Sequence, residues 1–298
     1  MTPLINTSFQ ERRFTASDGL QLYARDYGYD NPQAQHSLPV ICLPGLSRNS
    51  RDFHLLALRL AAHAERPRRV IAVDYRGRGF SAWDPDKSHY QLPVEAADVL
   101  TACEVLDISR AIFIGTSRGG LILHLLAAMR PALLGGVVLN DIGPVIDITG
   151  LLLIRQYLQA HGTFHAWDEA VESLQRVHGA AFPALDPADW KDMAEAIFRK
   201  KDGVITADFD PALIEPLQSL NADTPIPDLW ALYEGFKAVP LMTIRGENST
   251  ILSKATVADM AERHPGMKSV TAGGQGHAPL LHRADLLSEI TAFINAIG

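Results

Sequence analysis

The 298-residue sequence predicts an α/β fold with a mostly parallel, eight-stranded sheet, and three observations support this prediction. Short apolar runs alternate with amphipathic helical segments, which is typical of βαβ units around a parallel sheet. A hairpin signal precedes this alternation. Between residues 144 and 238 the alternation stops, and helical segments with Pro-rich joints take over. We therefore expect a core of residues 1–143 and 239–298, with residues 144–238 as a helical lid or cap inserted after the sixth strand. The simpler alternative is an insertion whose acidic helices only keep the surface soluble.

The expected elements can be justified in chain order. Buried-type or alternating β-rich runs predict strands at residues 9–14, 20–27, 39–43, 70–73, 111–114, 136–139, 239–244 and 267–270. Apolar residues at helical spacing predict flanking helices at residues 52–64, 94–106, 119–129, 255–262 and 284–297. The pair Asp18-Gly19 lies between the first two strands and favours a tight hairpin turn there.

Composition excludes several classes of protein. The chain has 27 Lys and Arg against 34 Asp and Glu, a net charge of −7, which argues against a general nucleic-acid binder. The lid segment holds 15 acidic and 7 basic residues, so it carries essentially all of this charge. No signal peptide is evident, and no apolar run reaches the ~18 residues of a membrane span. We expect a cytoplasmic protein without a membrane partner, either a monomer or a homodimer.

The most informative residues are Gly115-Thr-Ser-Arg-Gly119. They follow an apolar strand and precede a helix, and G-x-S-x-G in that context is typical of a nucleophile elbow. The turn raises Ser117 at a helix N-terminus, where backbone N–H groups stabilise developing negative charge. We predict that Ser117 is a nucleophile and that the N–H of Arg118 is one oxyanion donor. A helix-capping serine in a Gly-rich corner is the simpler alternative.

With this turn in place, the chain resembles the α/β-hydrolase superfamily over nearly its whole length. Leu43-Pro-Gly-Leu-Ser47, a loop running from Asp74 to Ser81, the serine turn and Gly276-His277 occur in the order of that superfamily. The resemblance implies a mostly parallel eight-stranded sheet with a lid after the sixth strand. It also implies that the N–H of Leu46 is the second oxyanion donor.

His277 is the predicted general base. It lies in a Gly-rich loop after the last expected strand, and such a loop can reach across the strand ends to Ser117. In the superfamily, a carboxylate that orients this histidine usually follows the seventh strand. Here Thr250 stands at that position, so three possibilities remain open: Asp141 after the sixth strand, Glu247 before Thr250, or no acid.

These residues favour a serine hydrolase that cleaves a carboxylic ester or lactone of a small, largely apolar substrate. We expect no cofactor and no metal, since no His, Cys or Asp cluster has ligand spacing. A carbon–carbon bond hydrolase would use the same residues. Thr250 also motivates a second class, a ligand-binding or slow, receptor-like member of the fold.

Overall fold

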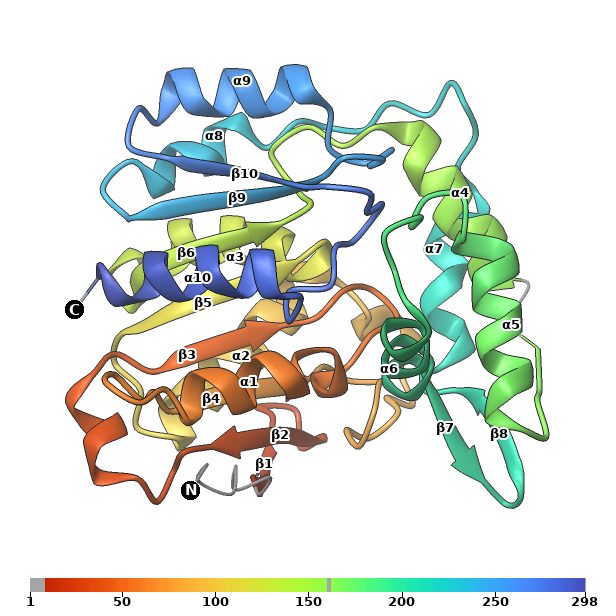
Figure 1. Ribbon diagram of the computed structural model, residues 1–298, viewed down its shortest axis with the longest axis horizontal. Helices are drawn as coiled ribbons and strands as arrows, with labels where there is room; N and C mark the ends of the chain where they lie inside the picture. Colours follow the sequence, from red (N-terminus) through yellow and green to blue (C-terminus); the bar gives the residue numbers. More distant parts are fainter. Residues whose placement is uncertain (1–8, 160–161, 298) are drawn as a thin grey trace.

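An eight-stranded sheet runs through the computed structural model, which describes residues 9–159 and 162–297 (Figure 1). Its strand order is β1-β2-β4-β3-β5-β6-β9-β10. β2 runs antiparallel to both of its neighbours, and the other neighbouring pairs are parallel. The strands are β1 (Gln10–Thr15), β2 (Gln21–Tyr27), β3 (Val40–Leu43), β4 (Val70–Asp74), β5 (Ala111–Thr116), β6 (Leu134–Asn140), β9 (Leu241–Gly246) and β10 (Lys268–Ala272). The predicted fold class is confirmed.

The first hairpin forms at the predicted turn. Gly19 has φ +90°, a conformation that glycine adopts without a steric penalty, and the Asp18 carboxylate accepts a hydrogen bond from the Leu20 N–H. β1 and β2 then pair in register from Gln10 with Asp26 to Thr15 with Gln21. The antiparallel edge of the sheet therefore follows from local turn chemistry.

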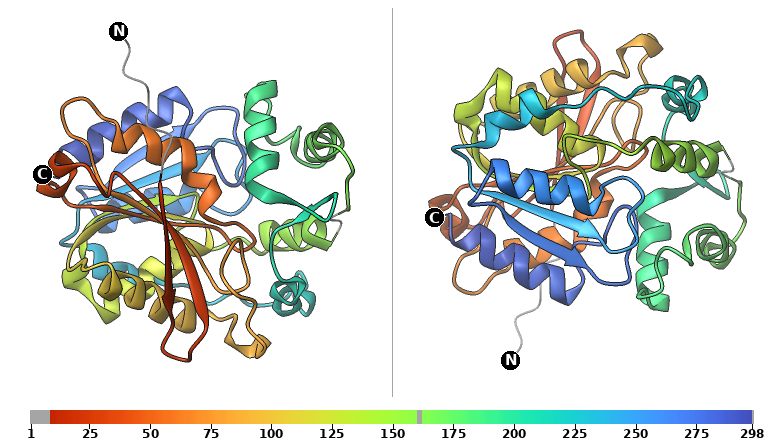
Figure 2. Two further views of the ribbon diagram at one scale, coloured as in Figure 1. Left: turned by 90° about the horizontal axis from the view of Figure 1, so that it is seen from below. Right: turned by 90° about the horizontal axis from the view of Figure 1, so that it is seen from above.

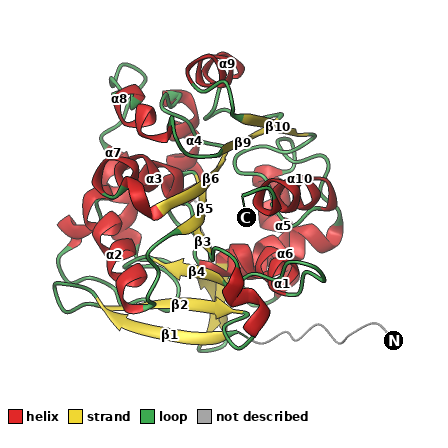
Figure 3. Cartoon of the chain, turned by 90° about the vertical axis from the view of Figure 1, so that its left-hand side faces the viewer, coloured by secondary structure: helices red, strands yellow, loops and turns green. Residues whose placement is uncertain are grey.

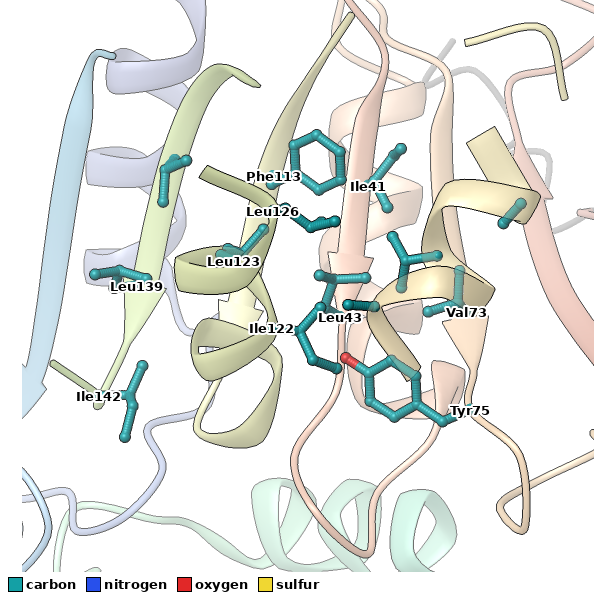
Figure 4. Close-up of a cluster of buried hydrophobic side chains, with 14 of the residues drawn as sticks. Ile41, Leu43, Val73, Tyr75, Phe113, Ile122, Leu123, Leu126, Leu139 and Ile142 are labelled. Atoms are coloured by element: carbon teal, nitrogen blue, oxygen red, sulfur yellow. The ribbon is translucent and has the colours of Figure 1, made fainter. Parts of the chain in front are cut away.

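Helices cover both faces of the sheet (Figure 3). α2 and α3 lie on one face, and α1 and α10 lie on the other. The core helices are α1 (His54–Ala61), α2 (Leu92–Val105), α3 (Arg118–Met129), α9 (Lys254–Arg263) and α10 (Ala284–Asn295). Every residue of β3, β4, β5 and β6 is buried, as expected for parallel strands covered on both faces. Figure 4 shows Phe113, Ile122 and Leu126 packed between α3 and the sheet.

The segment between β6 and β9 leaves the sheet where the parallel strands end (Figures 1 and 2). It contains α4 (Ile148–Gln159), α5 (Trp167–His178), α6 (Pro187–Ile197), β7 (Phe198–Lys201), β8 (Val204–Ala207), α7 (Glu215–Gln218) and α8 (Trp230–Tyr233). α5, α6, β7 and β8 share a small hydrophobic core. The prediction of helices alone is incomplete, because β7 and β8 form a hairpin over Asp202 (φ 51°) and Gly203 (φ 85°).

Several contacts tie this insertion to the rest of the chain, on more than one side of it. α8 packs against α3, so the chain returns to the core before β9 begins. Residues 77–79 pair with residues 208–210 through the Gly79 N–H to the Asp208 carbonyl (3.0 Å) and the Asp210 N–H to the Gly77 carbonyl (2.7 Å). No helix among the described residues is long and apolar enough to cross a membrane.

Candidate active site

Ser117 lies on a strained turn between β5 and α3. Its backbone has φ 50° and ψ −113°, a conformation that costs free energy for a residue with a Cβ. The turn packs so closely on its neighbours that a Cβ at Gly119 would lie 2.2 Å from the Leu43 carbonyl oxygen. A Cβ at Gly115 would lie 2.7 Å from the backbone of Gly119. Both glycines are therefore required by space, as the G-x-S-x-G pattern indicates.

The loop between β10 and α10 carries His277 to this turn. The His277 Nε2 lies 2.9 Å from the Ser117 Oγ, so the hydroxyl can donate its proton to an unprotonated ring nitrogen. Asn140 supports the loop, because its side-chain amide donates to the Pro279 carbonyl (3.1 Å) and to the Thr116 hydroxyl (3.0 Å). The serine and the histidine, which are 160 residues apart in sequence, thus meet at hydrogen-bonding distance.

Asp141 is the carboxylate that contacts His277. The His277 Nδ1 lies 2.8 Å from the Asp141 Oδ2, and the Asp141 side chain is fully buried. Asp141 directly follows β6 in a left-handed conformation (φ 54°). The Gly246 N–H donates to its Oδ1 (2.8 Å), and the Ser249 hydroxyl donates to its Oδ2 (2.7 Å). Three donors therefore satisfy this buried carboxylate, as a buried charge requires.

The two other positions considered for the acid lie elsewhere. Glu247 is exposed, and its carboxylate accepts a hydrogen bond from the Gly274 N–H (2.7 Å) at the start of the His277 loop. Thr250 is exposed as well. Its neighbour Ser249 takes part instead, as a donor to Asp141. The segment at the end of β9, where the acid is expected, thus supplies two hydrogen bonds to Asp141, which follows the adjacent strand β6.

The two expected oxyanion donors are Leu46, which lines the same cavity as Ser117, and Arg118, which follows Ser117 in the chain. Arg118 is the first residue of α3, so its N–H has no partner one helical turn earlier. Among the described residues, no backbone carbonyl accepts a hydrogen bond from the N–H of Leu46 or of Arg118. This is what the expected role of the two N–H groups as donors to a ligand requires.

A cavity of about 510 Å³ opens above Ser117 and His277. Its floor is built from strand ends and the His277 loop, and its opposite wall comes from the insertion. That wall is largely apolar and includes Ile154, Leu158, Trp167, Leu174, Phe182 and Met193. Trp190 is buried in the core of the insertion, and Trp230 packs on Arg263, so one of the three tryptophans of the insertion faces the cavity.

Further titratable side chains line the same cavity. Burial lowers the pKa of His282, which lies 3.7 Å from Asp189 and 3.9 Å from Asp192. Burial raises the pKa of Tyr157 to about 12, although the nearby Arg48 guanidinium acts in the opposite direction. His282 is therefore mostly neutral at neutral pH, and the Tyr157 hydroxyl keeps its proton.

One group of side chains in the described part of the chain has spacing suited to a metal ion. It consists of Asp18, Asp84 and His89. The Arg76 guanidinium already donates to both carboxylates of this group. The group is thus an ion-pair cluster around an arginine, and it lies outside the residues that line the cavity.

Ser249 and Asn140 are site residues that the sequence analysis did not identify. Ser249 adjoins the position where relatives in the superfamily carry the acid, which is a usable signal. Asn140 is the last residue of the otherwise apolar strand β6, and a buried amide at such a position needs hydrogen-bond partners. Both signals depend on knowing which acid is used.

The model of one protein family, described as the alpha/beta hydrolase family, matches residues 40–290. A 3-hydroxybutyrate-oligomer hydrolase from Cupriavidus necator is 30% identical over 246 residues, which cover 80% of this chain and 82% of that protein. A 2-(acetamidomethylene)succinate hydrolase from Mesorhizobium japonicum is 25% identical over 256 residues, which cover 85% of this chain and 86% of that protein.

Solved structures agree with these sequence matches. The crystal structure of an alpha/beta hydrolase from Novosphingobium aromaticivorans superposes with a TM-score of 0.87. It is 37% identical in sequence, and the alignment covers 96% of this chain and 98% of that one. The similarity therefore includes the insertion as well as the sheet.

Proposed function

Because the chain belongs to the alpha/beta hydrolase family, we propose that it is a serine hydrolase that cleaves carboxylic esters or lactones of small, largely apolar substrates. The observation that carries the proposal is the pair of hydrogen bonds joining Asp141 to His277 (2.8 Å) and His277 to Ser117 (2.9 Å). A nucleophile, a base and an orienting acid in this geometry define a catalytic triad.

In the first half of the reaction, His277 takes the proton of the Ser117 hydroxyl as the oxygen attacks the ester carbonyl. The N–H groups of Leu46 and Arg118 donate to the oxyanion that develops. The Asp141 carboxylate stabilises the imidazolium. That imidazolium then gives its proton to the departing alcohol, and the acyl group remains on Ser117.

In the second half, water replaces the alcohol. His277 removes a proton from the water as it attacks the acyl carbonyl, and then returns a proton to Ser117 as the acid leaves. No further group is needed to balance these steps. The wall of the cavity opposite Ser117 is largely apolar, which suits an alkyl or aryl portion of the substrate.

We also propose that residues 144–238 act as a lid on a core formed by residues 1–143 and 239–298. The support is that α4, α5 and α6 contribute side chains to the cavity above Ser117. A cover of this kind shapes the pocket for the substrate and limits the access of bulk water to it. The relative that hydrolyses 3-hydroxybutyrate oligomers favours an ester as the bond that is cleaved.

The binding-protein alternative is motivated by Thr250, which leaves the usual position of the acid without a carboxylate. The hydrogen bond between Asp141 and His277 favours the enzyme over that alternative. A receptor needs a pocket but not a buried carboxylate held by three donors against an imidazole.

The test is hydrolysis of p-nitrophenyl esters of increasing acyl length by the wild type and by Ser117→Ala. We expect turnover by the wild type and a loss of about 10⁴-fold or more in kcat/KM for Ser117→Ala. Ser269→Ala is the matched control, because Ser269 is an exposed serine on β10, and we expect it to keep full activity. A fluorophosphonate should label Ser117 in the wild type. Absence of both turnover and labelling would contradict the proposal.

A further inference from the structure

Two buried side chains stand behind the proposed oxyanion donors. Leu46 follows β3 and Arg118 begins α3, so separate segments of the chain supply the two N–H groups. Arg78 and Glu95 connect these segments. Neither side chain has any exposure to solvent. No mechanistic step proposed for the serine and the histidine uses this pair.

Glu95 lies in the first turn of α2 and accepts hydrogen bonds from two arginines. Its Oε1 lies 2.6 Å from the Arg78 Nη1, and its Oε2 lies 2.6 Å from the Arg118 Nε. Burial alone would raise the pKa of Glu95, but the two guanidinium groups outweigh it, and the pKa is lower than usual. Glu95 is therefore an anion held between two cations at neutral pH.

Arg78 extends this network to the other donor. Its Nε donates to the Leu46 carbonyl (2.8 Å), and its Nη1 also donates to the Arg76 carbonyl (2.7 Å). The Leu46 carbonyl belongs to the peptide plane that follows Leu46, and the Leu46 N–H belongs to the plane before it, so this bond anchors the residue that carries the donor, while φ and ψ of Leu46 relate the two planes. The Arg118 side chain makes one further contact, in which its Nη2 donates to the Tyr90 carbonyl (3.2 Å).

A buried network of this kind is a poor source of stability. Removing three charges from water costs several kcal/mol per ion, and apolar side chains of similar size often serve the fold as well or better. Its contacts, however, fix the relative position of two segments with directional, charge-assisted hydrogen bonds. Oxyanion donors must be held within about 0.5 Å of their productive positions to be effective.

We propose that Glu95 is a positioning residue that holds the Leu46 and Arg118 N–H groups in place through Arg78 and the Arg118 side chain. The inference rests on the proposed serine hydrolase function. Glu95 and Arg78 do not touch the substrate. They set where the negative charge of the tetrahedral intermediate is received.

The chain supplies a matched control one turn along the same helix. Asp98 is buried on α2, and its two carboxylate oxygens accept from the Arg76 Nη2 and Nε, both at 2.7 Å. The other carboxylate partners of Arg76 are Asp18 and Asp84, in the β1–β2 turn and the loop before α2. The Asp98 network is thus also charged and largely buried, and its side-chain contacts lead to the β1–β2 turn and the loop before α2 instead of to Leu46 and Arg118.

The experiment compares Glu95→Gln with Asp98→Asn in hydrolysis of a p-nitrophenyl ester and in inhibition by an aryl trifluoromethyl ketone. The ketone forms a hemiketal oxyanion on Ser117, so its Ki reports the oxyanion donors. For Glu95→Gln we expect kcat to fall about 10- to 100-fold and the Ki to rise by a similar factor. KM should change by less than about threefold, and the pH profile should keep its shape because His277 and Asp141 are untouched.

Asp98→Asn should lower the melting temperature but keep kcat and the ketone Ki within about threefold of wild type. If Glu95→Gln does not fold, Arg118→Met tests the same ion-pair network. It removes the guanidinium that contacts Glu95 at a partly exposed position and keeps the backbone N–H. We expect the same joint change in kcat and Ki for that variant.

The inference is overturned if the folded Glu95 variant keeps its kcat and Ki, or if Asp98→Asn loses as much as Glu95→Gln. A change in KM alone would also overturn it, because that indicates ground-state binding. Wild-type turnover distinguishes the two levels of failure. If the wild type neither hydrolyses esters nor is labelled at Ser117, the proposed function fails and the inference with it. If the wild type is active, only the positioning role of Glu95 is at stake.

Discussion

The two halves of the proposed site are held in different ways. In the proton-transfer half (Ser117, His277 and Asp141), the carboxylate accepts from the histidine and from two neutral donors, a backbone N–H and a hydroxyl. In the oxyanion half (Leu46 and Arg118 with Arg78 and Glu95), the donors are tied back to a buried carboxylate between two guanidinium groups.

This difference matches what each half has to do. In the proposed mechanism the histidine gains and loses a positive charge in each cycle, and neutral donors to Asp141 leave that change compensated by one anion. The oxyanion donors keep their charge state and must only stay in place, so permanent ions are suitable supports. Changes to the first half should therefore alter proton transfer, and changes to the second should alter oxyanion stabilisation.

The largest expected loss of activity comes from replacing Asp141, the acid of the proton-transfer half. Asp141→Asn keeps the shape of the side chain but removes the charge that stabilises the imidazolium, so kcat should fall about 10⁴-fold. Steady-state hydrolysis of an aryl ester measures the change. Glu247→Gln is the control, because Glu247 is exposed and contacts the Gly274 N–H rather than His277; it should stay within about threefold of wild type. An Asp141 variant within about twofold of wild type would contradict the assignment.

A smaller effect is expected at the hydroxyl that supports this acid. Ser249→Ala removes the 2.7 Å donor to the Asp141 Oδ2, and one lost hydrogen bond to a charged group corresponds to about 10-fold in kcat. Ser249→Thr keeps the hydroxyl and should restore most of the rate. Thr250→Ala changes the exposed neighbour and should have no effect on kcat. Equal losses for the alanine and threonine variants would show that the hydroxyl is not the cause.

The smallest expected effect on activity comes from His124, which belongs to neither half; its replacement should change the stability of the fold at acid pH. Burial lowers the pKa of His124 to about 4, although the Gly120 carbonyl at its Nδ1 acts in the opposite direction. The unfolded chain, with an ordinary imidazole pKa, binds this proton as pH falls from about 6.5, but the folded chain does not bind it until about 4. Stability is therefore lost across that window, by about 2–3 kcal/mol at pH 4.5.

A pH–rate profile can compare the two halves only at pH values where the protein stays folded, and this loss of stability determines how far into the acid range that is. Urea unfolding at pH 7 and at pH 4.5 measures it, and His124→Leu should reduce the difference between the two pH values. An unchanged difference in the variant would assign the acid sensitivity to other groups.

Local sequence signals predicted the parts of the site that are local. The serine turn needs only one strand, one turn and one helix, all within about 20 residues of Ser117, and its glycines are explained by contacts at that turn. The eight strands were predicted for the same reason, because each buried run has its own apolar pattern. The Asp202-Gly203 hairpin carried the same Asp-Gly signal as the first hairpin, but the helical pattern around it concealed the signal.

The long-range parts could not be decided in this way. Asp141 and Glu247 follow neighbouring strands, β6 and β9, so both are near the His277 loop, and side-chain direction separates them. Glu95 and Arg78 are charged residues whose burial depends on the packing of α2 against α3. Their partnership with Arg118 becomes visible only when three segments, far apart in sequence, are seen together.

The pairing between residues 77–79 and 208–210 limits how this protein can be recombined with its relatives. The insertion leaves and re-enters the sheet at adjacent strands, so its two ends alone would suit an exchange of residues 144–238 as a module. A segment taken from a relative, however, must also keep two contacts with the core. Asp208 accepts a hydrogen bond from Arg51, and Asp210 accepts one from the Tyr90 hydroxyl. We therefore expect engineered chimeras to tolerate more change in α4 and α5 than at residues 208–210, because the latter pair with the loop that carries Arg78.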